Sequence, residues 1–272
     1  MRPRWIAAAG LILALLVAST LVAHDLFLVP ARFFVAPNSV VRVRVLNGTF
    51  TKSDAAVAWD RVAAASLVGP AGVTELGADA WQERGDTSVL TLRAGDSGTY
   101  VVGLSVQPRM IRLEAAEFNE YLRIDGVPDV LEARRESGEL DEPARERYSK
   151  HVKALLQVGD ARTETYATVL GYPAELVPLS NPYALHSGDT LPVRALVDDA
   201  PVADQFIVAG WSTQARTRIA QDTTRTDAQG IARIPLRSEG RWYIKFIHMA
   251  AIPADTTLDY ESKWTTLTFE IR

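Results

Sequence analysis

The sequence of 272 residues contains no cysteine. This absence excludes disulfide bonds, thiolate metal sites, iron–sulfur clusters and a cysteine nucleophile. Histidine is scarce as well, with four residues, so a histidine-rich chelating tract is also excluded. A metal ion on this chain would therefore need histidine nitrogen, carboxylate, amide or amine groups, or water as its ligands.

The chain lacks a strong excess of charge of either sign, because its formal net charge is -4 at pH 7. Proteins that follow nucleic-acid phosphates present a concentrated basic face, so we expect no nucleic-acid partner. Enzyme motifs are absent too: the sequence has no Gly-x-Ser-x-Gly, no glycine-rich phosphate loop, no His-Glu-x-x-His and no dinucleotide fingerprint. We therefore predict that the protein is not an enzyme.

The amino terminus has the pattern of a secretory signal. Arg2 and Arg4 precede an apolar run over residues 5–18, and Ala23 suits the position before a cleavage site. An uncleaved membrane anchor is the alternative, since the apolar stretch is just long enough to span. Cleavage would place the protein in the periplasm and make His24 its first residue, and the membrane would then be contacted only through an uncleaved signal.

Alternating apolar and polar residues dominate the region after the signal and predict short strands that end in Gly, Asp, Asn or Pro turns. The expected strands cover residues 40–46, 88–92 and 99–105. Beyond residue 182 a second set follows, at residues 191–197, 205–211, 231–236, 240–249 and 265–271. The spacing is typical of antiparallel sandwiches.

The middle of the chain changes character. Residues 115–156 are rich in charge, and three apolar stripes with helical spacing predict helices from residue 115, over 130–135 and over 142–156. The predicted fold is therefore mainly β, with two antiparallel β-sandwich domains of immunoglobulin-like or transthyretin-like type and a helical insertion. The expected divisions are residues 1–23 (signal), 24–175 (first sandwich with the insertion at about 115–156) and 176–272 (second sandwich).

Histidines are the first candidates for metal ligands. A terminal His24 could chelate a metal through its α-amine and its imidazole together, and a second imidazole would complete a three-nitrogen set suited to Cu(II), or with oxygen ligands to Ni(II). His248 ends the apolar face of its expected strand and is either a ligand or a core histidine. The carboxylates of Asp25 and Glu261 are the candidate oxygen ligands. His151 stands between Lys150 and Lys153, whose charges disfavour a metal, so we expect a structural or surface role for it.

Three segments resemble the DUF4198 family. They are the His24–Pro30 start, which follows the signal; the Gly-x-Trp-x-Ile strand over residues 240–244, which leads to His248; and the closing segment Asp259–Glu270. Residues 146–151 resemble members of the same group. The second sandwich separately resembles transthyretin-like and collagen-binding B-type modules.

This resemblance implies a periplasmic metal-handling role, because members of the family are often described as periplasmic parts of nickel or cobalt uptake systems. It places His24 and His248 at the matching positions. The expected cofactor is then a transition metal ion, Ni²⁺ or alternatively Co²⁺ or Cu²⁺, and the expected partners are components of a membrane metal transporter. Two other functions stay open: a non-catalytic structural or adhesive module of the cell envelope, and a copper-binding histidine-brace protein.

Overall fold

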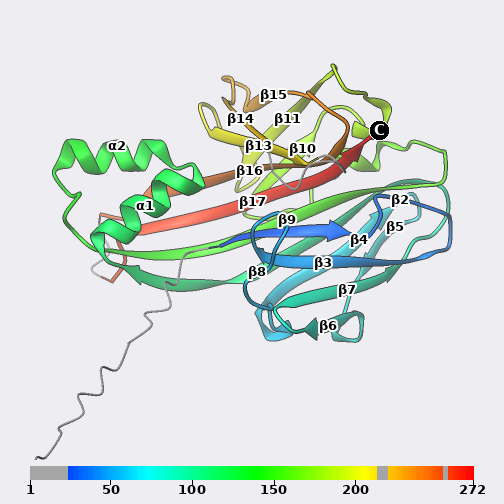
Figure 1. The fold of residues 1–272 in the computed structure, drawn as a ribbon, viewed down its shortest axis with the longest axis horizontal. Coiled ribbons are helices and arrows are strands. Elements are labelled where there is room, and N and C mark those ends of the chain that lie inside the picture. The colour runs from blue at the N-terminus through cyan, green and yellow to red at the C-terminus, as the bar shows by residue number, and fades with distance from the viewer. Residues whose placement is uncertain (1–23, 213–219, 254–256) are drawn as a thin grey trace, which may run out of the picture.

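The computed structural model describes residues 24–212, 220–253 and 257–272. The predicted signal peptide and its cleavage site lie outside these residues. Figure 1 shows three layers of strands, with two α-helices at one end of the longest strands. The prediction of a mainly β, sandwich-like fold with a helical insertion is confirmed.

A nine-stranded sheet forms the central layer, in the order β14-β13-β16-β17-β9-β8-β4-β5, with β2 beside β9. Its strands are β2 (Phe34–Val35), β4 (Val62–Gly69), β5 (Gly72–Glu75), β8 (Gly98–Leu113), β9 (Ala144–Val158), β13 (Phe206–Ser212), β14 (Ala220–Arg225), β16 (Gly240–Ala251) and β17 (Tyr260–Ile271). Neighbours are antiparallel except that β9 runs parallel to β17 and to β2.

The helix predicted over residues 142–156 is wrong, because this segment is strand β9. β9 lies in the middle of the central sheet and is buried on both faces, so its sequence does not alternate between apolar and polar residues. The apolar residues Tyr148, Val152 and Leu155 have helical spacing only by coincidence. Pairing with β8 and β17 overrides that local pattern.

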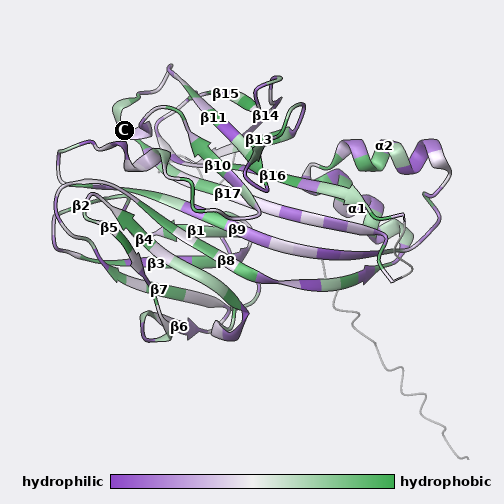
Figure 2. Cartoon of the chain, turned by 180° about the vertical axis from the view of Figure 1, so that it is seen from behind, coloured by the Kyte–Doolittle hydropathy of each residue, from purple (hydrophilic) through white to green (hydrophobic). Residues whose placement is uncertain are grey.

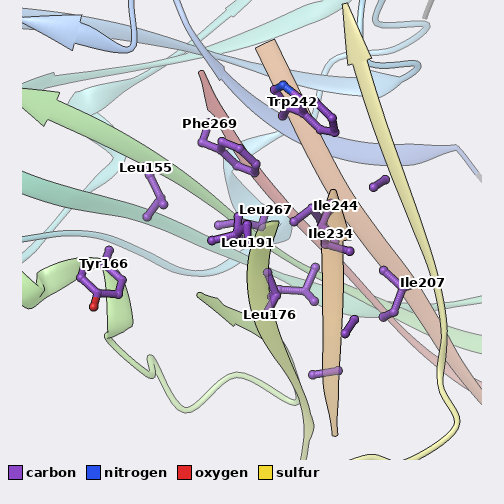
Figure 3. Close-up of a cluster of buried hydrophobic side chains, with 14 of the residues drawn as sticks. Leu155, Tyr166, Leu176, Leu191, Ile207, Ile234, Trp242, Ile244, Leu267 and Phe269 are labelled. Carbon is purple, nitrogen blue, oxygen red and sulfur yellow. The ribbon is translucent and has the colours of Figure 1, made fainter. Parts of the chain in front are cut away.

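One face of the central sheet, which we call the upper face, is covered by β10 (Ala174–Pro178), β11 (Thr190–Val197), β12 (Ala200–Pro201) and β15 (Ile231–Pro235). Apolar residues of both layers interdigitate there, together with Tyr166 from a short 3₁₀ helix. Figure 3 labels this tyrosine and nine residues of the two layers: Leu155, Leu176, Leu191, Ile207, Ile234, Trp242, Ile244, Leu267 and Phe269. Complete burial of each such aliphatic or aromatic side chain stabilises the fold by roughly 1.5–3 kcal/mol. This core holds the second sandwich together.

The opposite, lower face is covered along part of its length by a four-stranded sheet in the order β1-β3-β7-β6. Its strands are β1 (Asp25–Pro30), β3 (Val40–Gly48), β6 (Trp81–Arg84) and β7 (Thr87–Arg93). The alternating residues Val41, Val43 and Val45 point into a core shared with β4, β8 and β9. Arg42 and Arg44 between them are exposed, as period-two alternation requires.

The remaining length of the lower face is covered by α1 (Ala115–Asp125), which is followed by α2 (Pro128–Ser137). Phe118, Tyr121 and Leu122 of α1 are buried against β16 and β17. Gly126 ends α1 with a φ of 86°, in the left-handed region that glycine tolerates. Short 3₁₀ helices occupy Trp59–Arg61, Ala78–Ala80, Glu164–Ala167 and Pro182–Ala184.

The predicted boundary at residues 175 and 176 divides the chain between strands of one continuous sheet. β4, β5, β8 and β9 come from the first part, and β13, β14, β16 and β17 come from the second. The two sandwiches therefore share their central layer, and the boundary itself stays a prediction. Among the described residues, no helix has the length and apolar character needed to cross a membrane.

Candidate functional site

Strand β1 places the first described residues against the lower face of the central sheet. Its residues Leu26 and Leu28 are buried, and their carbonyl oxygens accept hydrogen bonds from Thr266 (2.8 Å) and Thr268 (2.5 Å) of β17. β1 also pairs antiparallel with β3 along its whole length. The segment that follows His24 is thus fixed by neighbours on two sides.

His24 faces a carboxylate from the loop that follows β3. Its Nδ1 atom lies 3.6 Å from Oδ2 of Asp54, and both side chains are about one-third exposed, at 34% and 33%. Oδ1 of Asp54 is 3.0 Å from Nζ of Lys52. A hydrogen bond from Lys52, and more weakly the charge of His24, lower the pKa of Asp54, so this carboxylate is ionised and available as a ligand.

Gly48 allows this approach. A Cβ atom at position 48 would lie 2.6 Å from the carbonyl oxygen of Lys52 and 2.7 Å from Oδ2 of Asp54. The amide of Asp54 donates to the carbonyl of Asn47 at 2.9 Å, which closes the loop. Only glycine leaves room for the loop to turn Asp54 toward His24.

Asp25 is held by a buried lysine. Lys245 on β16 places its Nζ 2.5 Å from Oδ2 of Asp25 and 3.5 Å from Oδ1 of Asp125, the last residue of α1. Burial lowers the pKa of Lys245, but the two carboxylates outweigh burial and raise it overall. Burial raises the pKa of Asp125 to about 7, against the charge of Lys245. Lys245 therefore stays charged and neutralises chiefly Asp25.

A second buried lysine holds the backbone of His24. Nζ of Lys150, on β9, donates a hydrogen bond to the carbonyl oxygen of His24. The same ammonium lies 5.2 Å from the ring centre of Tyr148 and 5.1 Å from that of Trp264, within range of cation–π attraction. Burial lowers the pKa of Lys150 to about 8. No carboxylate forms a direct ion pair with it among the residues described.

Glu146 completes this group of charges beneath α1. Its Oε1 accepts hydrogen bonds from Tyr121 (3.0 Å) and from Ser262, whereas its Oε2 is buried without a hydrogen-bond partner. Burial raises the pKa of Glu146. We call Asp25, Asp125, Glu146, Lys150 and Lys245 the buried lysine cluster. Figure 2 shows hydrophilic positions recurring along the ends of the long strands nearest α1.

The structure does not bring together the four residues expected to share a metal. His24 and Asp25 lie at the lower face, whereas His248 shares the upper face of β16 with Phe246 and Ile244. Glu261 also alternates onto the upper face of β17 and forms an ion pair with Arg147 at 2.8 Å. The central sheet separates the two pairs, so the shared site of His24 and His248 is not formed. Within the described ranges, no three histidine or carboxylate side chains are grouped to hold a metal.

His248 has a partner of its own. Its Nδ1 lies 3.0 Å from Oε1 of Gln205, whose amide nitrogen donates to the carbonyl of Ile247. Since that amide oxygen can only accept, Nδ1 of His248 carries the proton. Burial, followed by the charge of Lys263, lowers the pKa of His248. The ring is therefore neutral at pH 7 and is positioned by the protein itself.

His151 lies inside β9, where it was expected in a helix. It is 2% exposed, with Ser105 2.8 Å from its Nδ1 and Ser149 3.0 Å from its Nε2. Burial lowers its pKa to about 4. Both ring nitrogens are occupied by hydroxyl groups, so His151 contributes to packing between strands.

Sequence reasoning missed Asp54 and both buried lysines as residues of the site. A lysine with apolar neighbours at every second position of a strand would be one signal, as for Lys245 between Tyr243 and Ile247. Lys150 gave no such signal because its segment was expected to be helical. The approach of Asp54 to His24 depends on the Gly48 turn, whose closure the sequence does not specify.

Comparisons with known proteins give one family and several distant structures. A family model described as "Domain of unknown function (DUF4198)" matches residues 21–250. No curated protein matches the sequence. Among solved structures, murine CEACAM1b is 11% identical with a TM-score of 0.21, over 91% of this chain and 99% of that one. A two-domain fibronectin type III segment of chicken tenascin is 11% identical with a TM-score of 0.22, over 91% and 98%. Trypsin-activated alpha-2-macroglobulin from Escherichia coli is 9% identical with a TM-score of 0.21, over 91% of this chain and 16% of that one. TM-scores this low carry no argument about function.

Proposed function

Since the chain belongs to the DUF4198 family, we propose that it is an exported, non-enzymatic accessory protein that binds a transition metal for a nickel or cobalt uptake system. His24 is the mature amino-terminal residue in this proposal. The single observation that carries it is the approach of the His24 imidazole to the Asp54 carboxylate, 3.6 Å apart, at a chain start held by Lys150 and Lys245.

The ligand set differs from the one expected from the sequence. An amino-terminal His24 would supply its α-amine and its Nδ1 to one metal ion as a chelate, and Asp54 would add an oxygen. Two ligand atoms at about 2.0–2.2 Å from a metal ion and at right angles to each other lie about 3 Å apart. A small movement of the Asp54 loop would bring Oδ2 from 3.6 Å to that separation.

The ligand set of His24 and Asp54 fits a Ni²⁺ or Co²⁺ site better than it fits a two-histidine copper brace. Nitrogen together with carboxylate oxygen is a mixed set that Ni²⁺ and Co²⁺ accept with water in the remaining positions. A brace needs a second imidazole, and His248 lies across the sheet from His24. The partners in this proposal are the membrane components of the transporter, and the location is the periplasm.

The test begins with the chain exported through its own signal in a Gram-negative host. Intact mass should show that the mature protein starts at His24. Titration calorimetry should then show one Ni²⁺ or Co²⁺ per chain with a Kd tighter than ~10 μM. His24→Ala should abolish this binding, and Asp54→Asn should weaken it about tenfold or more. Two extra residues placed ahead of His24 keep the ring but remove its terminal amine, and should weaken binding as strongly as His24→Ala.

His186 provides the matched control. It is 79% exposed, and its Nδ1 lies 3.8 Å from a carboxylate, that of Asp189, as His24 lies near Asp54. His186→Ala should leave the affinity unchanged, because no chain terminus adds an amine there. Equal binding by wild type and His24→Ala would reject the His24 site, and no saturable binding of Ni²⁺, Co²⁺ or Cu²⁺ would reject the metal function and favour the structural or adhesive module.

A further inference from the structure

A groove with several arginines lies at the end of the molecule opposite the α-helices, beside β2 and the last residue (Figure 1). It has a volume of about 780 Å³. Arg32, Arg42 and Arg272 line it, and Asp160 is the single acidic side chain among its lining residues. A hollow of about 380 Å³ shares Arg32 and Arg272 with it, and is also lined by Arg241 and Glu270.

These arginines come from separate parts of the chain that the fold gathers. Arg32 follows β1, Arg42 is on β3, Arg241 is the second residue of β16 and Arg272 follows β17. The fold therefore concentrates positive charge in one place, which the small net charge of the whole sequence does not reveal. Such convergence differs from a solvated run of charges along one element, in which neighbouring side chains point apart.

Two of the groove arginines have no acidic partner among the described residues. Glu270 lies 3.6 Å from Arg241 and 3.4 Å from Arg272, so it serves these two together. Arg32 and Arg42 are exposed, and neither has a carboxylate within ion-pair distance in the part of the chain that the structure describes. Partial burial and the nearby Arg241 lower the pKa of Arg44, which shows that guanidinium groups crowd this end.

The groove also has an apolar wall. Phe34, Val35, Ala36 and Val40 line it, and Val40 is 56% exposed. Arg272 stacks over Phe34, with its guanidinium carbon 3.7 Å from the ring centre, and this contact fixes the direction of its donors. An anion bound here would meet oriented guanidinium groups on one side and apolar surface on the other.

We infer that this groove binds a phosphate-bearing anion through Arg32, Arg42 and Arg272. A guanidinium group matches phosphate with two parallel hydrogen bonds, and a phosphate group offers more oxygens and more charge than a single carboxylate does. The apolar wall would accept the organic part of such a ligand. The ligand is either a soluble phosphate compound or the headgroup of an anionic phospholipid. This site is separate from His24 and does not depend on the proposed metal function.

Calorimetry with sodium pyrophosphate on chelator-treated, dialysed protein tests the soluble source. Flotation with vesicles of phosphatidylcholine containing phosphatidylglycerol tests the lipid source. We expect saturable binding of at least one probe, which weakens as salt is raised. Arg32→Gln combined with Arg42→Gln should weaken it at least tenfold. Both arginines are exposed, so circular dichroism and thermal unfolding should show an unchanged fold.

Two controls make the result specific. Arg135→Gln removes an exposed arginine of α2 that pairs with Glu132, and should change the affinity less than twofold. His24→Ala should also leave phosphate binding intact, so a failure of the metal proposal does not affect this one. Absence of binding to both probes, or equal binding by the double arginine variant and wild type, would overturn the inference.

Discussion

Buried lysines on the two faces of the central sheet, Lys153 and Lys150, have different kinds of partner. On the upper face, Lys153 forms an ion pair with Glu175, and that carboxylate also accepts the amides of Leu170 and Tyr172. On the lower face, Lys150 has a carbonyl partner and aromatic rings, and Glu146 keeps one oxygen without a hydrogen bond. The charges of Lys153 and Glu175 are thus paired, and Glu175 also stabilises the loop that contains Leu170 and Tyr172. The buried lysine cluster on the lower face holds His24 and Asp25, where a ligand could still alter the balance of charge.

The difference follows from what each face must do. A buried charge is tolerated when a partner and hydrogen bonds compensate its desolvation, as they do for Lys153 and Glu175. The same compensation fixes one structure and leaves no group free for a ligand. Burial lowers the pKa of lysines on both faces, Lys153 as well as Lys150, but beneath α1 it also raises the pKa of the carboxyl group of Asp125 to about 7. Perturbed groups of this kind cluster at functional sites.

The largest effect is expected from breaking the upper pair. Glu175→Ala leaves Lys153 buried without its acidic partner, so we expect a loss of about 3–5 kcal/mol in the free energy of unfolding. Urea denaturation measures it. Glu175→Ala combined with Lys153→Met removes both charges and should recover much of the loss. A cost below about 1 kcal/mol for the single variant would show that water reaches Lys153.

Lys245→Met should be less costly than this, because Asp125, whose pKa is raised to about 7, can take up a proton when its cationic partner is removed. We expect a loss of roughly 3 kcal/mol at pH 8 and a smaller loss at pH 5.5. The sign follows from the pKa of Asp125, which is raised to about 7 in the folded protein. The proton on a group with a raised pKa stabilises the fold at low pH, and this contribution is lost as the pH rises through 7. Denaturation at the two pH values measures the difference, and equal losses would contradict it.

Metal affinity gives Lys245→Met a second measurement. Loss of the contact with Asp25 frees the start of β1, so we expect Ni²⁺ affinity at neutral pH to fall about tenfold. Glu175→Ala is the comparison, because it weakens the other face of the sheet without contacting β1. An affinity that falls equally in both variants would mean that stability alone governs binding.

The third effect is a pH dependence of the free energy of unfolding, which comes from His151 on the upper face. Burial lowers the pKa of His151 to about 4, from an ordinary value of 6.5. Between pH 6.5 and pH 4, His151 is protonated in the unfolded chain but stays neutral in the folded chain. The free energy of unfolding therefore has its full value above pH 6.5 and falls as the pH is lowered toward 4. We expect about 2 kcal/mol less stability at pH 4.5 than at pH 7.5 from this residue. His151→Asn keeps polar contacts with Ser105 and Ser149 and should lessen the loss.

The sequence predicts the strands with one solvated face best. β3 and β11 match their expected ranges within two residues, because turns bound them and polar side chains alternate outward. β9 was missed because a strand buried on both faces carries no such alternation. His24 was identified through its position after the signal. Asp54 and Lys245 were not, since their approach to β1 depends on a loop closure and a layer contact between residues about 30 and 220 positions apart, which local patterns do not encode.

The smallest effect concerns Glu261, the expected ligand that the structure pairs with Arg147. Both side chains are more than one-third exposed, so solvent screens their attraction. Glu261→Gln should change the free energy of unfolding by less than about 0.5 kcal/mol, and Ni²⁺ affinity by less than twofold. Asp54→Asn, which also removes one carboxylate charge, should leave stability similarly unaffected but weaken Ni²⁺ binding about tenfold. The two variants therefore distinguish the faces by ligand binding alone, and a tenfold loss of affinity in Glu261→Gln with none in Asp54→Asn would place the metal at the upper face instead.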